Sequence, residues 1–211
     1  MSRRFALDLI HGRAVAVAIA GDDGEGNLPE EVAAAAHLGP ARRREYLAGR
    51  RALRAALADL GVTAPAIGAD PRGAPIVPAP MVGSISHKGE LALAVAAPAD
   101  GWTVGVDLER RAPRTIDLSR RVLTDRELVA LADRDDDARR RAVVQAFAIK
   151  EAIYKAIDPF LGRYVGFREV AVWPEGDRVE VEAPAAWGLE VVAACAAVDD
   201  HWVATARARR R

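Results

Sequence analysis

The sequence predicts an α+β protein made of two halves, each with a set of strands and one long helix. Two stretches of about 20 residues, 41–60 and 139–157, follow the spacing of an amphipathic helix. Short apolar runs bounded by turn residues surround both stretches. The order strand, helix, strands therefore occurs twice, although no sequence repeat accompanies it. We expect the halves to be residues 1–100 and 101–211, divided at the turn formed by 98–101.

The N-terminal half begins with an apolar run at 14–20 that is suited to a buried strand. Residues 30–38 are expected to form a short helix. The longer helix over 41–60 is expected to end at Gly61, because glycine readily adopts the left-handed conformation that follows a helix.

Five prolines in 65–80 predict an extended connection, because proline cannot continue a helix or a central strand. Two strands are expected after it, at 81–86 and 91–97. A turn over 88–90 joins them, which predicts an antiparallel pair.

The C-terminal half opens with a strand predicted at 103–109. Thr124 and Glu127 have the spacing of a capping box and predict a short helix. The long helix over 139–157 is expected to end before Pro159. Four more strands are expected at 169–173, 178–182, 189–198 and 201–206.

Composition excludes several classes of protein. The formal net charge is zero, so no overall field favours nucleic acid or a membrane surface. No apolar run approaches the roughly 20 residues of a membrane span, and no secretory signal follows the N-terminus. Cys195 is the only cysteine, which precludes an internal disulfide and indicates a small buried strand residue. A cytoplasmic location is expected.

Two carboxylates alternate on the strand predicted at 103–109. Residues two apart on a strand share a face, so Gly105, Asp107 and Glu109 point one way and the apolar residues between them point into a core. Carboxylates this close repel one another and favour a cation beside them, and oxygen ligands favour Mg²⁺ or a similar hard ion. The alternative is a solvent-facing strand end paired with arginines such as Arg110.

The second long helix carries a further acid and a lysine. Glu151 and Lys155 are four residues apart and share a helix face at the flank of an apolar arc. As an ordinary surface ion pair they would contribute about 0.3–0.5 kcal/mol to the stability of the fold. Lys150 falls inside the arc, so its ammonium must reach solvent or meet an anion. With Asp107 and Glu109, this face predicts a hard-cation site with a phosphate-pairing ammonium.

Groups suited to phosphate collect in the N-terminal half. The segment 83–87 is expected to end a strand and to offer backbone N–H groups, the Ser86 hydroxyl and the His87 imidazole. Arg72 precedes a flexible turn, and the helix over 41–60 is rich in arginine, whose planar fork donates bidentately to phosphate. His87 as a hydrogen-bonded turn residue is an equal alternative, and most of the arginines are expected to be solvated.

Three segments together resemble the 4′-phosphopantetheinyl transferases of the larger, monomeric class, which activate siderophore, polyketide and nonribosomal peptide synthases. They are 83–87 (GSISH), 105–109 (GVDLE) and 147–156 (FAIKEAIYKA), and their order and spacing carry the resemblance from about residue 42 to 169. The family implies two similar α+β halves related by a pseudo-twofold. Each half is a mainly antiparallel sheet packed on a long helix, and CoA binds in the cleft between them.

The resemblance also implies roles for individual residues in the C-terminal half, the metal and catalytic side. Asp107, Glu109 and Glu151 would hold Mg²⁺ or Mn²⁺ together with the CoA diphosphate. Lys155 would pair with that diphosphate, and these four residues form the implied catalytic set. Lys150 and Tyr154 would line the route of the pantetheine arm.

The N-terminal half would hold the adenosine and 3′-phosphate end of CoA. The implied contacts are Arg42, Arg50, Arg72 and His87, with Ser86 beside them. The segment Tyr46-Leu47-Ala48-Gly49-Arg50 is similar to a CoA-contacting stretch of the family.

The implied reaction is attack of a carrier-protein serine hydroxyl on the β-phosphorus of CoA, with 3′,5′-ADP leaving. Glu151, or Glu109 through a water, would take the serine proton, and the sequence leaves this choice open. Lys155 would offset charge that develops toward the leaving group. The expected partners are acyl or peptidyl carrier proteins, docked on a basic face at the arginine-rich helix or near 160–164.

Two other functions compete with this one. A non-catalytic module that binds CoA or a nucleotide would use the arginines and His87 but would have no need for three acids. A nucleic-acid binder would use residues 42–54 and 207–211, but zero net charge and few aromatic residues argue against it.

Overall fold

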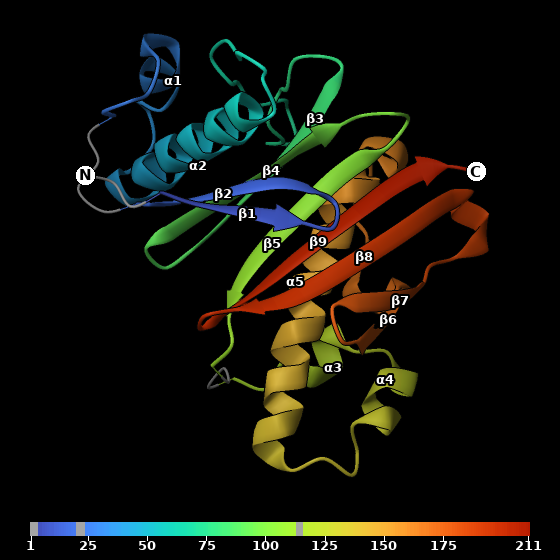
Figure 1. Ribbon diagram of the computed structural model, residues 1–211. Coiled ribbons are helices and arrows are strands. Elements are labelled where there is room, and N and C mark those ends of the chain that lie inside the picture. The colour runs from blue at the N-terminus through green and yellow to red at the C-terminus, as the bar shows by residue number, and fades with distance from the viewer. Residues whose placement is uncertain (1–3, 20–23, 113–115) are drawn as a thin grey trace. The chain divides into compact units, whose positions relative to one another are not determined.

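Two sheets, each packed against one long helix, make up the fold of the computed structural model (Figure 1). Residues 4–19, 24–112 and 116–211 are described. The chain divides into two units, Met1–Val104 and Gly105–Arg211, and each is described by itself. The predicted α+β class is confirmed, because antiparallel strand pairs and helices occur in both units.

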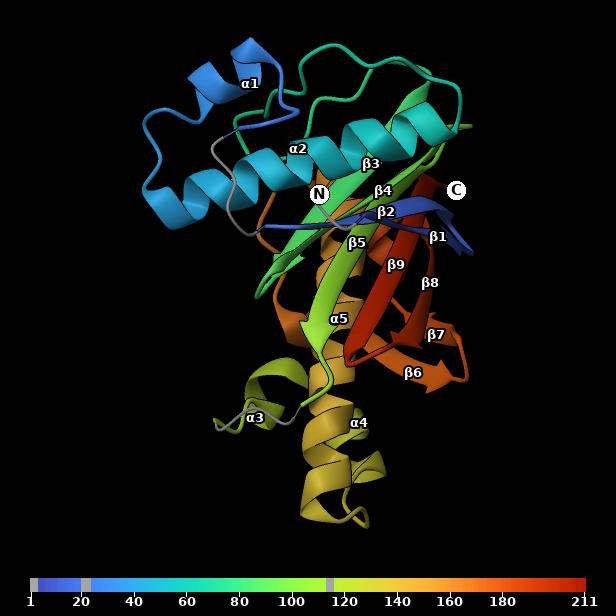
Figure 2. The same cartoon turned by 60° about the vertical axis from the view of Figure 1, so that its left-hand side comes forward.

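The first unit contains a four-stranded antiparallel sheet in the order β1-β2-β4-β3. Its strands are β1 (Arg4–Leu9), β2 (Gly12–Ala18), β3 (Met81–Lys88) and β4 (Leu91–Pro98). The long helix α2 (Pro40–Asp59) lies across one face of this sheet, and the short α1 (Pro29–Ala34) lies beside it (Figure 2).

The core of the first unit lies between α2 and the sheet. Pro40 occupies the first turn of α2, where its missing N–H costs nothing, and Leu53 and Leu57 face inward with no exposed surface. Burying each leucine contributes roughly 1.5–3 kcal/mol. Gly49 permits the close approach of β3, because a Cβ there would lie 2.7 Å from Cγ2 of Ile85.

The second unit contains a five-stranded sheet in the order β5-β9-β8-β7-β6. Its strands are β5 (Thr103–Arg110), β6 (Ala171–Glu175), β7 (Arg178–Glu182), β8 (Leu189–Val198) and β9 (His201–Arg210). Its helices are α3 (Ser119–Val122), α4 (Asp125–Ala130), the 26-residue α5 (Asp136–Leu161) and the short 3₁₀ turns η1 (Phe167–Glu169) and η2 (Ala185–Trp187).

The core of the second unit forms where α5 packs on β8 and β9. Ile149, Ile153 and Ile157 of α5 have no exposed surface, and small residues of the strands, including Cys195 and Ala204, lie in the same apolar cluster. The predicted capping box is confirmed, because the Glu127 N–H donates to Oγ1 of Thr124 and the Thr124 N–H donates to the Glu127 carboxylate.

Several predicted element boundaries differ from the observed ones, among them those of the short helix predicted at 30–38, which is Pro29–Ala34, and of the strand predicted at 169–173, which is Ala171–Glu175. The last long helix does not end before Pro159 but continues to Leu161 and ends at Gly162, whose φ is 58°. A proline in the final turn removes only one helical hydrogen bond. Residues 4–9 form β1, a strand that we did not predict, while residue 20 of the strand predicted at 14–20 lies outside the described residues.

No helix in the described part of the chain has both the length and the apolar character needed to cross a membrane.

Candidate functional site

The second unit brings the predicted acids of β5 against α5. A Cβ on Gly105 would lie 2.0 Å from the carbonyl oxygen of Ala152, so strand and helix touch through their backbones at this point. Asp107 and Glu109 follow on the same strand face and are each only 6% exposed. The alternative of a solvent-facing strand end is therefore wrong, and both faces of this strand are buried.

Lys155 connects α5 to this strand. Its ammonium donates to Oδ1 of Asp107 and to the carbonyl oxygen of Val106, both at 2.8 Å. The side chain of Asp107 is 8% exposed and that of Lys155 31% exposed, so the ion pair lies at the edge of the buried region. The structure thus joins two of the predicted catalytic residues, which lie 48 positions apart in the sequence.

Glu151 lies one helical turn before Lys155, about 6 Å along the axis of α5. It is half-buried, on the part of the helix that adjoins β5. Among the described residues, however, no three His, Cys, Asp or Glu side chains are grouped closely enough to hold a metal ion. Binding of one ion by Asp107, Glu109 and Glu151 therefore requires their side chains to turn toward one another.

The donor set nevertheless fits a hard cation. All three candidate ligands are carboxylates, and the two on β5 are nearly enclosed by protein. Like charges at such positions favour a cation between them, and oxygen-only ligands suit Mg²⁺ or Mn²⁺ better than a softer metal. Lys155 offers a positive charge at the same place.

Lys150 meets an anion within the protein. Its ammonium has no exposed surface and donates to Glu127 at 2.7 Å, to the Val122 carbonyl at 2.8 Å and to the Phe167 carbonyl at 3.1 Å. Burial lowers the pKa of Lys150, and the hydrogen bond and charge of Glu127 oppose that shift. Because these contacts use all three donors, the burial argues against the predicted contact between Lys150 and the pantetheine arm.

Tyr154 is also held by contacts within its own unit. Its hydroxyl donates to the Gly166 carbonyl at 2.9 Å, and its ring centroid lies 5.3 Å from that of Phe167. Burial raises the pKa of the phenol above its usual value. The predicted role of Tyr154 along a pantetheine route stays a prediction.

In the first unit, Arg42 and His87 lie together although 45 positions separate them. Nη1 of Arg42 donates to Nε2 of His87 at 2.8 Å, which leaves Nδ1 of the imidazole directed at Oε1 of Glu45, 3.5 Å away. Arg42 also contacts Glu45 at 3.3 Å. An exposed guanidinium beside an imidazole is an arrangement that suits a phosphate.

The other predicted arginines differ in their surroundings. Arg50 is 7% exposed, lies 3.7 Å from the centroid of the Tyr46 ring and donates to the Ile67 and Gly68 carbonyls, each at 3.4 Å. Burial lowers its pKa, but a guanidinium keeps its charge at neutral pH. Arg72 lies on an exposed turn, where its backbone N–H donates to Oδ1 of Asp70.

Ser86 does not lie beside His87 on one surface. Strand β3 continues to Lys88, so the two residues are consecutive within a strand and point to opposite faces. Ser86 is 6% exposed, whereas the His87 side chain is 32% exposed. The prediction that this segment already enters a turn at His87 is wrong, because pairing with β4 extends through Lys88.

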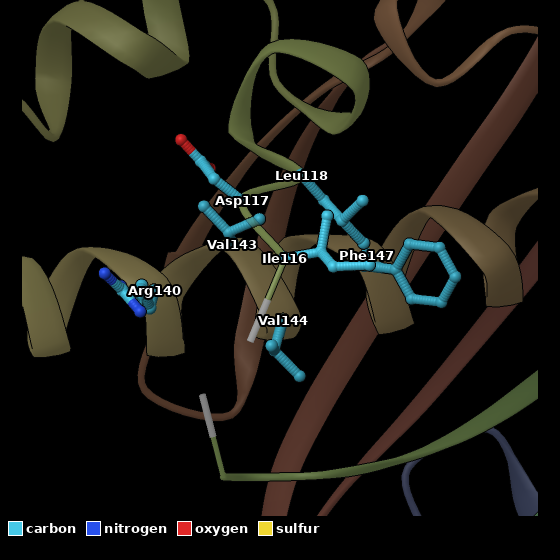
Figure 3. A pocket seen from close by; sticks show the side chains of 7 residues that line it. All are labelled: Ile116, Asp117, Leu118, Arg140, Val143, Val144 and Phe147. Carbon is cyan, nitrogen blue, oxygen red and sulfur yellow. The ribbon is translucent and has the colours of Figure 1, made fainter. Parts of the chain in front are cut away.

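A shallow hollow beside α5 was not predicted by any motif. It is lined by Ile116, Asp117, Leu118, Arg140, Val143, Val144 and Phe147. Figure 3 shows the apolar Ile116, Leu118 and Phe147 gathered at one end, with Asp117 and Arg140 at the other. Ile116 is 71% exposed, and Phe147 lies one turn before Glu151.

Comparisons with known proteins match both units to one family. Residues 28–97 match the 4′-phosphopantetheinyl transferase N-terminal domain, and residues 103–206 match the 4′-phosphopantetheinyl transferase superfamily. The chain belongs to the 4′-phosphopantetheinyl transferase superfamily.

Three curated relatives illustrate this membership. The 4′-phosphopantetheinyl transferase Npt of Nocardia iowensis is 37% identical over 62% of this chain and 59% of its own length. The 4′-phosphopantetheinyl transferase Svp of Streptomyces mobaraensis is 35% identical over 70% of this chain and 62% of its own. Enterobactin synthase component D of Escherichia coli O157:H7 is 39% identical over 57% of both chains. The chain thus spans 57 to 62% of the length of these relatives.

Proposed function

We propose that this protein transfers the 4′-phosphopantetheine group of CoA to a serine hydroxyl of an acyl or peptidyl carrier protein, with release of 3′,5′-ADP. The observation that carries the proposal is the contact of β5 with α5. In a chain of this superfamily, Lys155 of α5 bonds to Asp107 of β5, Glu109 follows Asp107 on the same face of the strand, and Glu151 lies one turn before Lys155. The relatives Npt and Svp, both 4′-phosphopantetheinyl transferases, support the same reaction.

Asp107, Glu109 and Glu151 would hold the metal ion, Mg²⁺ or Mn²⁺, after their side chains turn toward it. A bound divalent ion would supply Lewis acidity and would draw charge from the diphosphate of CoA. The chain itself supplies two nearly enclosed carboxylates on β5, and the low dielectric around them would strengthen their attraction for a bound cation.

Lys155 would stabilise the leaving group. Its ammonium is bonded to Asp107 but remains about one-third exposed, so it can also contact a bound diphosphate. A fixed positive charge near the leaving oxygen lowers the energy of the transition state more than that of the ground state. Glu151, or Glu109 through a water, would take the proton of the attacking serine.

The first unit, residues 1–100, would hold the adenosine and 3′-phosphate end. Arg42 and His87 form the contact that supports this assignment, because an exposed guanidinium and an imidazole lie 2.8 Å apart. Arg72 on its exposed turn would add a further donor. Arg50 would act through the 67–68 segment that its guanidinium holds. The location of CoA in a cleft between the halves stays a prediction.

The carrier protein would dock on a surface with apolar and basic character. The exposed ring of Tyr164 and the apolar end of the hollow at Ile116 and Phe147 are surfaces of the second unit that suit this role. The exposed arginines of α2 remain the alternative basic surface. A monomeric, cytoplasmic enzyme is the form we propose.

Intact mass spectrometry of an apo carrier protein tests the reaction. Incubation with this protein, CoA and Mg²⁺ should increase the carrier mass by one phosphopantetheine, and EDTA should abolish the increase. A carrier whose serine is replaced by alanine serves as the control. If neither acyl nor peptidyl carriers gained mass, the proposal would be contradicted.

Glu151→Gln separates catalysis from simple binding of CoA. The substitution preserves the shape of the side chain but removes its charge and its ability to accept a proton. We expect carrier modification to be lost, while calorimetry still detects binding of CoA to the variant. Full activity of this variant would show that the charge of Glu151 is needed neither to hold the metal ion nor to accept the serine proton.

A further inference from the structure

We propose that the buried Lys150–Glu127 ion pair positions Glu151, so that Lys150 and Glu127 are positioning residues of the reaction proposed above, on which this inference rests. Neither side chain belongs to the proposed metal set. Both act through the segment of α5 that carries the third carboxylate.

Lys150 is connected to three separate segments. Its donors reach the Val122 carbonyl at the end of α3, the Glu127 carboxylate in α4 and the Phe167 carbonyl in η1. The ammonium has no exposed surface, so water cannot replace any of these acceptors. A buried ammonium with three fixed acceptors restricts both the rotation and the axial position of the helix that carries it.

Glu127 extends the same network to a fourth segment. Its Oε2 accepts from the Thr124 N–H at 2.6 Å and from the Thr124 hydroxyl at 2.8 Å, and its Oε1 accepts from the Val172 N–H of β6 at 2.9 Å. Glu127 is 3% exposed. One carboxylate therefore caps α4, pairs with α5 and holds the start of β6.

The position of this network explains its effect on the site. Glu151 follows Lys150 directly, and successive side chains on a helix differ in direction by about 100°. Next to Glu151, Ala152 touches β5 through its backbone at Gly105. The helix is thus fixed on one side by the ion pair and on another by the strand. Loss of the ion pair removes a buried polar anchor on its side of the helix, and the contact with β5 and the apolar packing on β8 and β9 are left to set the direction of Glu151.

Two single variants, one double variant and one control test the inference. Lys150→Met removes the ammonium, and Glu127→Gln removes the charge but keeps an amide of the same shape. Each leaves the other partner buried without its counter-charge, which is destabilising. The double variant leaves no buried charge, so its urea midpoint should return toward that of the parent. Arg141→Met, an exposed site on the same helix, is the matched control.

We expect the double variant to separate stability from positioning. Its kcat and its Mg²⁺ activation should stay impaired by about 10–100-fold, as for other residues that orient metal ligands, while KM for CoA changes little. Amide hydrogen exchange in residues 151–156 should be faster than in the parent under native conditions. Arg141→Met should match the parent in every measurement.

The contrary outcomes are equally definite. Parental kcat and Mg²⁺ activation in the folded double variant would overturn the inference, as would parental exchange in residues 151–156. If the double variant does not fold, Glu127→Gln alone gives the same two readouts below its melting temperature. If the parent modifies no carrier, the proposed function fails, and the exchange measurement alone decides whether the ion pair fixes this part of α5.

Discussion

At the scale of single residues, Gly105 determines how closely β5 and α5 approach. Its missing side chain lets the strand backbone contact the helix backbone, and Asp107 then lies within reach of Lys155. A carboxylate and an ammonium can meet here only because no Cβ separates the two elements. The glycine is therefore as much a part of the site geometry as the charged residues are.

Gly105→Ala is expected to destabilise the protein and to impair the site. The new Cβ would lie 2.0 Å from the Ala152 carbonyl oxygen and 2.8 Å from the Ala156 nitrogen, and backbone atoms cannot move aside cheaply. Overpacking of this kind costs about 1–3 kcal/mol or more. Urea denaturation measures the loss. Gly166→Ala, where the nearest atom is 3.8 Å away, should have a much smaller effect. Equal midpoints for the two variants would contradict the close contact.

Cys195 illustrates a residue whose chemistry is suppressed by its surroundings. Burial raises the pKa of its thiol to about 12, so the nucleophilic thiolate is scarce at pH 8. We expect native protein to react with a disulfide reagent such as DTNB far more slowly than urea-unfolded protein, which should titrate one thiol per chain. Rapid reaction of the native protein at pH 8 would show that the thiol is accessible.

Some site residues could be predicted from the sequence and others could not. Alternation on a strand and four-residue spacing on a helix identify Asp107, Glu109, Glu151 and Lys155, because both rules depend only on local geometry. The surroundings of Lys150 depend on segments 17 to 28 positions away, so its buried partners could not be found by spacing. The same limit applies to Glu45, which lies beside His87 only after α2 has packed on β3.

At the scale of elements, Glu31 fastens α1 to α2 and to the connection that follows. Its carboxylate is 1% exposed and accepts from Asn27 at 2.8 Å, from the Ile67 N–H at 3.1 Å and from Arg54. Burial alone would raise the pKa of Glu31, but the hydrogen bonds from Arg54, Asn27 and Ile67 outweigh it, and the net shift is downward.

Glu31→Gln should therefore lower stability in a pH-dependent way. Because the folded-state pKa lies below the unfolded value of about 4.3, the unfolded chain binds more protons in acid, and the contribution of Glu31 is complete at neutral pH. That contribution is lost as pH falls through the folded-state pKa. We expect a deficit of about 1.5–3 kcal/mol at pH 7, the usual worth of a hydrogen bond to a charged group.

Urea unfolding at pH 7 and at several lower values measures this dependence. The deficit of Glu31→Gln against the parent should shrink once the pH falls below about 4. Glu30→Gln, an exposed acid on the same helix, is the control and should show no comparable deficit at pH 7. A deficit that stays constant down to pH 3 would mean that the charge of Glu31 is not what stabilises α1.

Element types could be predicted well, whereas their boundaries could not. Apolar periodicity locates α2 and α5 because each buries one continuous face. The start of α5 at Asp136 depends on the Asp135 side chain, which accepts from the Ala138 N–H at 2.8 Å. Four aspartates lie within residues 133–137. Any of these acids could serve as the cap, so composition alone does not select one.

At the scale of the whole molecule, the proposed function divides the recognition of CoA between the two units. The first unit has its own sheet, helix and core and carries Arg42 and His87. The second has another core and carries the carboxylates with Lys155. On this proposal, residues of the first unit detect the 3′-phosphate and residues of the second act on the diphosphate, so each can be tested by changing one end of the ligand.

The 3′-phosphate end gives a clear test of this division. We expect the parent to bind CoA more tightly than 3′-dephospho-CoA in calorimetry with Mg²⁺, because a guanidinium bond to phosphate contributes about 1.5–3 kcal/mol, or roughly 10–150-fold in affinity. Arg42→Ala should lose this preference, because its affinity for CoA should fall while its affinity for 3′-dephospho-CoA should not change. Arg44→Ala, an exposed position two residues along α2, should keep the preference, and Glu151→Gln should change the affinities for both ligands equally.

If Arg42→Ala lowered the affinities for both ligands alike, Arg42 would not contact the 3′-phosphate. The adenosine end would then have to be held by other residues, because a group that contacts only the 3′-phosphate cannot change the affinity of a ligand that lacks it.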